Sequence, residues 1–152
     1  MSRRDQIRMT DEEARTFLAG RHTMNVATHG PDDRIHLVAM WYGFLDGAPA
    51  FWTYARSQKV VNLRRNPAMT CLVEAGETYA TLRGVELVGR GTVIDDPASV
   101  QAVGESVFER YTAPVDDAAR QAVTAMAAKR VAVRVDAERV VSWDHAKLEG
   151  RY

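Results

Sequence analysis

The sequence contains very little cysteine, since Cys71 is the only one among 152 residues. One cysteine cannot form an internal disulfide, and it cannot supply a thiolate cluster for a metal within one chain. Cys71 lies in an alternating segment, residues 69–73, that is typical of a strand. We therefore expect a buried, inert thiol with no chemical role.

The sequence also lacks a long apolar run. No stretch approaches the roughly 20 apolar residues that a membrane-spanning helix needs. Residues 1–15 carry charges of both signs and have no apolar stretch of signal-peptide length. We therefore expect a cytoplasmic protein that does not enter a membrane.

An overall excess of charge of one sign is missing as well. Twenty basic residues balance twenty acidic ones, so the chain has no net field that attracts a polyanion, and nucleic acid is not an expected partner. One segment is nevertheless locally basic, because Arg56, Lys59, Arg64 and Arg65 lie close together in the sequence. We expect any electrostatic recognition of an anion at this segment.

Motifs of several enzyme classes are absent. No Gly-x-Gly-x-x-Gly follows the first predicted strand, which argues against a Rossmann domain. No Gly-x-Ser-x-Gly is present, so a serine hydrolase has no support. The histidines His22, His29, His36 and His145 lack metal-ligand spacing, and none is followed by a cysteine pair, so we expect no metal site.

What the sequence does contain is a series of short alternating segments. With 46% apolar residues, residues 1–152 suffice for one domain with its own core. Strand patterns lie at residues 22–28, 35–42, 50–54, 68–75, 78–88, 90–94, 130–136 and 138–143. Many short strands joined by turns favour an antiparallel barrel over a parallel doubly wound sheet. The predicted fold is mainly β with helices.

Helix signals are fewer and lie between these strands. Thr10 and Glu13 form a capping-box pattern at the start of a short helix, and Ser57 can cap another short helix that Asn66 and Pro67 end. Pro97 opens a helix to about residue 111, and residues 116–128 predict a further helix.

The segment from Tyr54 to Lys59 predicts an anion site. It places Arg56, Ser57 and Lys59 at the amino end of the short helix, where backbone amides point outward and the helix dipole is positive. Arg56 and Lys59 can then pair with phosphate oxygens. The alternative is that both cations are solvated and Ser57 only caps the helix.

Aromatic side chains crowd the two strand segments that lead to this site. They are Trp41, Tyr42, Phe44, Phe51, Trp52 and Tyr54. A planar ring system needs such walls in its pocket. Core packing explains most of these side chains equally well.

Three segments together resemble a known superfamily. They are Arg56-Ser57-x-Lys59-Val60-x-Asn62-Leu63-x-x-Asn66-Pro67, the run 82–91 followed by Asp95-Asp96-Pro97, and the ending Ser142-Trp143-Asp144-His145-x-Lys147-Leu148. In this order they resemble the FMN-binding split barrels of the pyridoxamine 5'-phosphate oxidases and their deazaflavin-dependent relatives. The nearest likeness is to the small oxidoreductases that bind coenzyme F420, and it covers the chain from Thr10 onward.

The resemblance implies a split β-barrel that forms a homodimer, with a cofactor pocket between two protomers. By resemblance, Arg56, Ser57 and Lys59 hold the cofactor phosphate. The residues that line the ring are then Ala39, Met40, Trp41, Thr53 and Tyr54, and those that approach from the partner are Tyr79, Lys147 and Tyr152. No side chain is required as a covalent catalyst.

The resemblance also implies a function. The leading hypothesis is an F420-dependent reductase that transfers a hydride to an unsaturated small molecule, and the second is an FMN-dependent oxidoreductase. A third is a non-enzymatic protein that stores or senses the cofactor or carries haem in a similar barrel. Pyridoxamine phosphate oxidases end in an Arg-x-x-Arg-Leu-type motif that the segment 142–148 lacks, which disfavours vitamin B6 oxidation.

Overall fold

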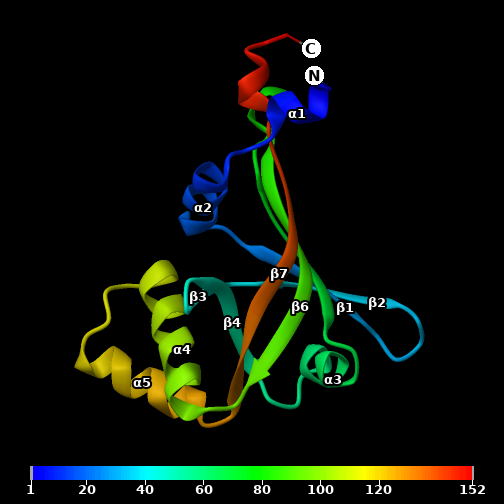
Figure 1. The fold of residues 1–152 in the computed structure, drawn as a ribbon. Helices are drawn as coiled ribbons and strands as arrows, with labels where there is room; N and C mark the ends of the chain where they lie inside the picture. The colour runs from blue at the N-terminus through cyan, green and yellow to red at the C-terminus, as the bar shows by residue number, and fades with distance from the viewer. Residues whose placement is uncertain (1, 152) are drawn as a thin grey trace.

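A computed structural model describes residues 2–151, and these residues form one antiparallel sheet of seven strands (Figure 1). The order across the sheet is β2-β1-β5-β6-β7-β4-β3. The strands are β1 (Met24–His29), β2 (Ile35–Met40), β3 (Gly43–Leu45), β4 (Ala48–Tyr54), β5 (Ala68–Ala75), β6 (Arg83–Ile94) and β7 (Arg130–Asp144). The mainly β architecture predicted from the sequence is confirmed.

The helices surround this sheet. They are α1 (Arg3–Ile7), α2 (Asp11–Ala19), α3 (Gln58–Arg65), α4 (Pro97–Tyr111) and α5 (Asp117–Ala127), with 3-10 turns η1 (Tyr79–Thr81) and η2 (His145–Leu148). The capping box of α2 forms as predicted, because the Glu13 amide donates to Thr10 Oγ1 over 3.1 Å and the Thr10 amide donates to Glu13 Oε2 over 2.7 Å. Pro97 opens α4 behind the N-cap Asp96, also as predicted.

Strands β6 and β7 are longer than the sequence predicts. The predicted strands 78–88 and 90–94 lie in the single strand β6, except that residues 79–81 form η1. The predicted strands 130–136 and 138–143 lie in the single strand β7. The ladder shifts register between Val88 and Gly89. A Cβ on Gly89 would lie 2.1 Å from the Asp136 carbonyl oxygen, so this glycine marks a bulge with close backbone approach rather than a strand end.

The β6–β7 ladder sets the length of the molecule and separates its two ends. Its register runs from Arg83 opposite Asp144 to Ile94 opposite Ala132. At the first end, α1 and η2 contact each other, whereas α3 and α4 pack near the other end (Figure 1). At about 3.3 Å per residue, the ladder spans about 35 Å.

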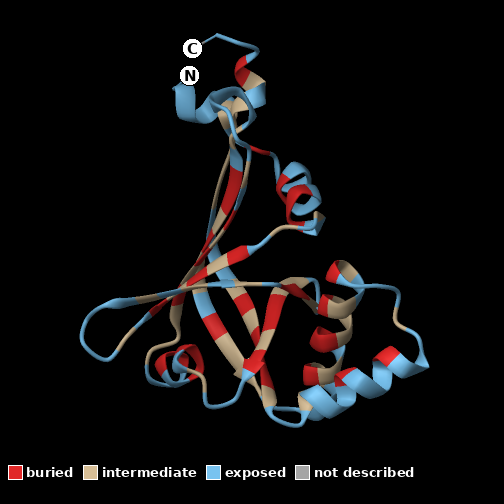
Figure 2. Cartoon of the chain, turned by 180° about the vertical axis from the view of Figure 1, so that it is seen from behind, coloured by how far each residue is buried: buried red, intermediate tan, exposed pale blue. Residues whose placement is uncertain are grey.

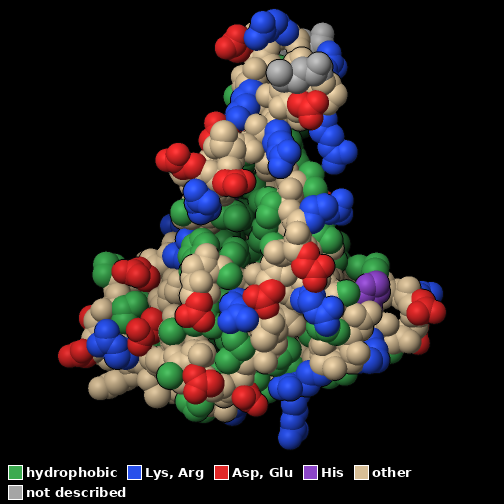
Figure 3. Space-filling model, viewed as in Figure 1, with side chains coloured by type: hydrophobic (Ala, Val, Ile, Leu, Met, Phe, Trp, Pro, Cys, Tyr) green, Lys and Arg blue, Asp and Glu red, His purple; other side chains and the backbone are tan. Residues whose placement is uncertain are grey.

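The buried residues, coloured in Figure 2, form two clusters. They lie on opposite faces of the β4–β7 ladder, because Phe51 and Val133 belong to the larger cluster and their neighbours Ala50 and Ala132 to the smaller one. On the face shown in Figure 3, hydrophobic side chains are visible between α2 and the β6–β7 ladder. The larger cluster lies between α2 and strands including β1, β5 and β6, and Met24, Val26 and Val85 are fully buried in it. The smaller cluster packs α4 on β4 and β7. None of the described helices has the length and apolar character needed to cross a bilayer.

Candidate functional site

Lys59 is buried in the first turn of α3, with only 8% of the residue exposed. Its Nζ donates a 3.0 Å hydrogen bond to Thr53 Oγ1 on β4, and the Thr53 hydroxyl in turn lies 3.4 Å from the Ser57 hydroxyl. Three predicted site residues, Thr53, Ser57 and Lys59, therefore lie together between the end of β4 and the first turn of α3.

The Lys59 ammonium has no ion-pair partner among residues 2–151. Burial lowers its pKa from the ordinary value of 10.5. A buried charge without a counter-charge is unfavourable unless an opposite charge arrives. The site therefore favours an anion from outside the chain.

The amino end of α3 adds further donors to this site. Ser57 occupies the predicted N-cap position, but within the described chain its hydroxyl makes no capping hydrogen bond. The first amides of a helix have no acceptor within the helix, and they carry the positive end of its dipole. In α3 these are the amides of Gln58 and Lys59, because the Val60 amide already donates to the Ser57 carbonyl oxygen over 3.1 Å. The ammonium, the two hydroxyls and these amides together form a set of donors suited to a phosphate.

Arg56 is exposed in the turn between β4 and α3. Together with Tyr54, Ala55 and Lys129 it lines a cavity of about 530 Å³. The guanidinium of Arg130 lies 4.4 Å from the centre of the Tyr54 ring, a cation–π contact that fixes this ring at the cavity wall. Tyr54 and Arg56 lie at the same end of the sheet as Lys59. The ring of Tyr54, however, faces the α4 side of β4 together with Trp52, opposite to Thr53 and Lys59.

Asn62 anchors α3, a role that the sequence does not indicate. It is fully buried, its Nδ2 donates to Thr28 Oγ1 over 3.0 Å, and its Oδ1 accepts from Gln58 Nε2 over 2.7 Å. Arg65 adds a 2.7 Å bond to the His29 carbonyl oxygen. The sequence carries no clear signal of this burial, because Asn62 is two positions from Val60 and one from Leu63, spacings that do not share a helical face.

Three predicted ring-lining residues lie on or just after the edge strand β2. Ala39 is exposed, Met40 packs against the core, and Trp41 stacks on Tyr111 of α4 with ring centres 4.8 Å apart. Met40 pairs with Met24 at one end of β1, whereas α3 is bonded to the other end of that strand. Their place in a ring pocket stays a prediction.

Tyr79 and Lys147 lie in η1 and η2, at the opposite end of the β6–β7 ladder from Lys59. His145 Nδ1 lies 2.9 Å from the Tyr79 carbonyl oxygen, and Lys147 Nζ bonds the Glu13 carboxylate over 2.5 Å. One chain therefore does not bring these two residues to the anion site, and only a second chain can do so. Tyr152 lies outside the described residues.

Cys71 and the acidic and histidine side chains form no competing centre. Cys71 is buried in β5, and burial raises the pKa of its thiol to about 12, so it is unreactive near neutral pH, as predicted. Across residues 2–151, no three His, Cys, Asp or Glu side chains converge as metal ligands do.

Residues 10–144 match the protein-family model described as pyridoxamine 5'-phosphate oxidase. A solved structure of a conserved hypothetical protein from Mycobacterium tuberculosis is 45% identical, covers 98% of this chain and 93% of its own, and superposes with a TM-score of 0.93. No curated protein matches the chain.

Two further solved structures share the fold at low identity. An F420 reductase is 23% identical, with 86% of this chain and 98% of that chain covered and a TM-score of 0.67. The haem storage protein HutZ from Vibrio cholerae is 14% identical, with 90% and 97% covered and a TM-score of 0.66. At these identities the likeness extends to the fold and no further.

Proposed function

The chain belongs to the pyridoxamine 5'-phosphate oxidase family and has its split-barrel fold, and on this premise we propose that it is an F420-dependent oxidoreductase. In this proposal the cofactor phosphate binds at the amino end of α3. A hydride then passes between the cofactor and an unsaturated small molecule.

The observation that carries the proposal is the buried Lys59 ammonium, which lacks a carboxylate partner within residues 2–151. A phosphate supplies the missing negative charge and accepts hydrogen bonds from the ammonium, the Ser57 hydroxyl and the first-turn amides. Arg56, one position before Ser57, adds a planar clamp from the solvent side.

A bound deazaflavin supplies hydride-transfer chemistry. The chain binds and orients it: Lys59 and Ser57 hold the phosphate at the end of β4, and Arg56 reaches it from the adjoining turn. We assign no catalytic side chain, because the proposed residues serve binding and orientation.

The preference for F420 over FMN rests on the cations at the same end of the sheet as the phosphate site. Arg56 and Lys129 line the cavity of about 530 Å³, and Arg130 stands over the Tyr54 ring at its wall. Coenzyme F420 carries an anionic oligoglutamate tail beyond its phosphate, and FMN does not. These cations favour the longer anion, with an attraction that salt weakens.

We propose further that the working unit is a homodimer. Ile35, Leu37 and Trp41 are at least half exposed, at 60%, 67% and 54%, and lie at alternating positions on or just after the edge strand β2. An unpaired edge strand with an apolar side favours association with another chain. A second copy that covers this stripe also offers a source for Tyr79 and Lys147 at the pocket.

The experiment that tests this function identifies the cofactor directly. The purified protein is mixed with F420, FMN and haem in turn, and the retained ligand is read by its absorption spectrum and by mass spectrometry. Retention of F420, and its reoxidation by activated alkenes or quinones when bound in reduced form, supports the proposal. Retention of FMN alone would contradict the choice of F420 and indicate an FMN-dependent oxidoreductase. Retention of haem alone would contradict an F420-dependent enzyme.

A further inference from the structure

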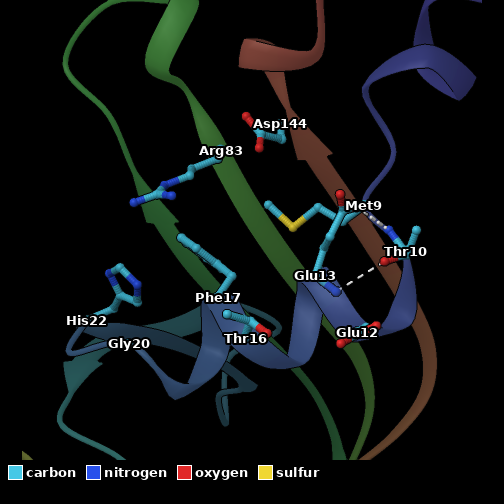
Figure 4. A pocket seen from close by; sticks show the side chains of 10 residues that line it. All are labelled: Met9, Thr10, Glu12, Glu13, Thr16, Phe17, Gly20, His22, Arg83 and Asp144. Carbon is cyan, nitrogen blue, oxygen red and sulfur yellow. Dashed lines mark hydrogen bonds between the residues drawn. The ribbon is translucent and has the colours of Figure 1, made fainter.

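A second cavity, of about 670 Å³, lies near the other end of the molecule (Figure 4). Its walls come from α2, the loop that follows it, and the paired ends of β6 and β7. The residues that matter for its chemistry are Glu12, Thr16, Phe17, His22, Arg83 and Asp144. None of them belongs to the anion site at α3.

Arg83 enters this cavity with its charge unpaired. It stands opposite Asp144 in the β6–β7 register, where an ion pair across the strands is the usual arrangement. Instead, its guanidinium turns away from Asp144 toward the side of Phe17 and His22, and lies 5.4 Å from the centre of the Phe17 ring (Figure 4). Within residues 2–151, the side chain of Arg83, which is exposed, has no hydrogen bond or ion pair.

An aromatic pair lies beside this cation. The rings of Phe17 and His22 are 4.4 Å apart, centre to centre, and tilted by 31°. Burial, followed by the charge of Arg83, lowers the pKa of His22 from 6.5, so its ring is neutral at pH 7. A flat, uncharged surface next to a guanidinium suits a planar ligand.

The acidic residues around the cavity do not pair with this cation. Glu13 is paired with Lys147, whose Nζ lies 2.5 Å from Oε2. The Asp144 carboxylate keeps its charge but accepts the Ala146 amide at the start of η2 instead of the guanidinium. Glu12 is exposed on α2, where water screens its charge. The guanidinium of Arg83 is therefore the charge at the aromatic end of the cavity that still lacks a partner.

We propose that this cavity is a binding site for a small planar carboxylate ligand. The carboxylate pairs with Arg83, which offers two parallel N–H donors, and the ring of the ligand lies against Phe17 and His22. The two sites share no residue, and within one chain they lie at opposite ends of the β6–β7 ladder, so binding in this cavity can be tested on the cofactor-free protein.

The test uses benzoate and its neutral analogue benzamide as probes of the full chain. Binding is followed by two-dimensional amide NMR, which also locates it. Benzoate is expected to bind about fivefold more tightly than benzamide, and the shifted amides are expected to lie in α2 and around Arg83. Equal affinity for the two probes, shifts centred elsewhere, or no binding of either probe would overturn the proposal.

Two variants and a control sharpen this test. Arg83→Gln is expected to remove the preference for benzoate. Arg90→Gln, which changes an exposed arginine of the same strand outside the cavity, is expected to keep it. Thr16→Trp places a large ring into the cavity from an exposed position of α2, so it is expected to exclude both probes without lowering the melting temperature. Benzoate preference that survives Arg83→Gln, or binding that survives Thr16→Trp, contradicts the site.

Discussion

The ammonium of Lys59 donates a 3.0 Å hydrogen bond to the hydroxyl of Thr53, and both side chains are buried at the junction of β4 and α3. A neutral hydroxyl satisfies one of the three N–H donors of the ammonium and none of its charge. The free protein therefore holds an uncompensated charge at this place, which an anionic ligand would complete.

Replacing Lys59 with Met tests whether this charge serves binding or folding. Met keeps much of the length of the side chain and removes the buried charge, so the free energy of unfolding of the cofactor-free protein should stay the same or rise by about 1 kcal/mol. Urea denaturation measures it, with Lys129→Met as an exposed control. A loss of more than about 2 kcal/mol would instead show that Lys59 supports the fold.

The pH dependence of binding gives a second test at the same residue. Burial lowers the pKa of Lys59 in the free protein below 10.5, whereas a bound phosphate favours the ammonium and raises it again. Binding then takes up a proton between the lowered pKa of the free protein and the higher pKa of the complex, so cofactor affinity should fall as pH rises through this window. In Lys59→Arg the guanidinium stays charged, and the fall should be lost.

The free energy of unfolding of the free protein should change with pH in the opposite direction to the cofactor affinity, because deprotonation of Lys59 relieves its burial. The folded pKa lies below the unfolded one, so the unfavourable burial of the ammonium is present in full below the folded pKa. It is relieved as pH rises toward 10.5. A cofactor affinity that stays flat over this window in the wild type would argue that the Lys59 ammonium does not meet the ligand.

Asn62 is expected to position α3. Asn62→Ala removes a buried amide, leaves the Thr28 hydroxyl without that donor and opens a cavity, so it should lower the free energy of unfolding by about 2 to 4 kcal/mol. Gln58→Ala, at an exposed position of the same network, should cost less than about 1 kcal/mol. Chemical denaturation of both variants compares them. Equal losses would show that the buried amide holds α3 no better than the exposed one.

The exposed apolar residues Ile35, Leu37 and Trp41 on or just after β2 predict that a charge introduced among them disrupts the proposed dimer. Leu37→Lys puts an ammonium in the middle of the exposed apolar positions of this edge strand, and it should convert the proposed dimer into a monomer. Light scattering measures the mass. Met126→Lys, at an exposed apolar residue of α5, is the matched control and should leave the mass unchanged. A wild-type monomer that still binds cofactor would contradict the dimer.

The sequence predicted the elements that depend on local interactions. The capping box joins Thr10 and Glu13, three residues apart, and Asp96 with Pro97 starts α4 through its own first turn. These signals act within a few residues, so they can be recognised without the rest of the fold. The position of α3 was predicted for the same reason.

Contacts between distant segments were not predictable in this way. The continuity of β6 and β7 depends on a bulge where Gly89 approaches the backbone of Asp136, and the burial of Asn62 depends on Thr28 in another strand. Nothing near Arg83 in the sequence indicates that it faces Phe17 rather than Asp144. Such pairings require the register of the assembled sheet.

The most direct test of the central claim is a fluorescence titration of F420 against the wild type and the double variant Arg56→Ala/Lys59→Ala, with FMN as competitor. Each charge-assisted hydrogen bond contributes about 1.5 to 3 kcal/mol. The double variant should therefore lose at least about tenfold in affinity, while its cofactor-free melting temperature stays close to that of the wild type. FMN should displace F420 only in excess, and more readily as salt increases. Unchanged F420 affinity in the double variant would contradict the anion site at α3, and tighter binding of FMN than of F420 would contradict the choice of cofactor.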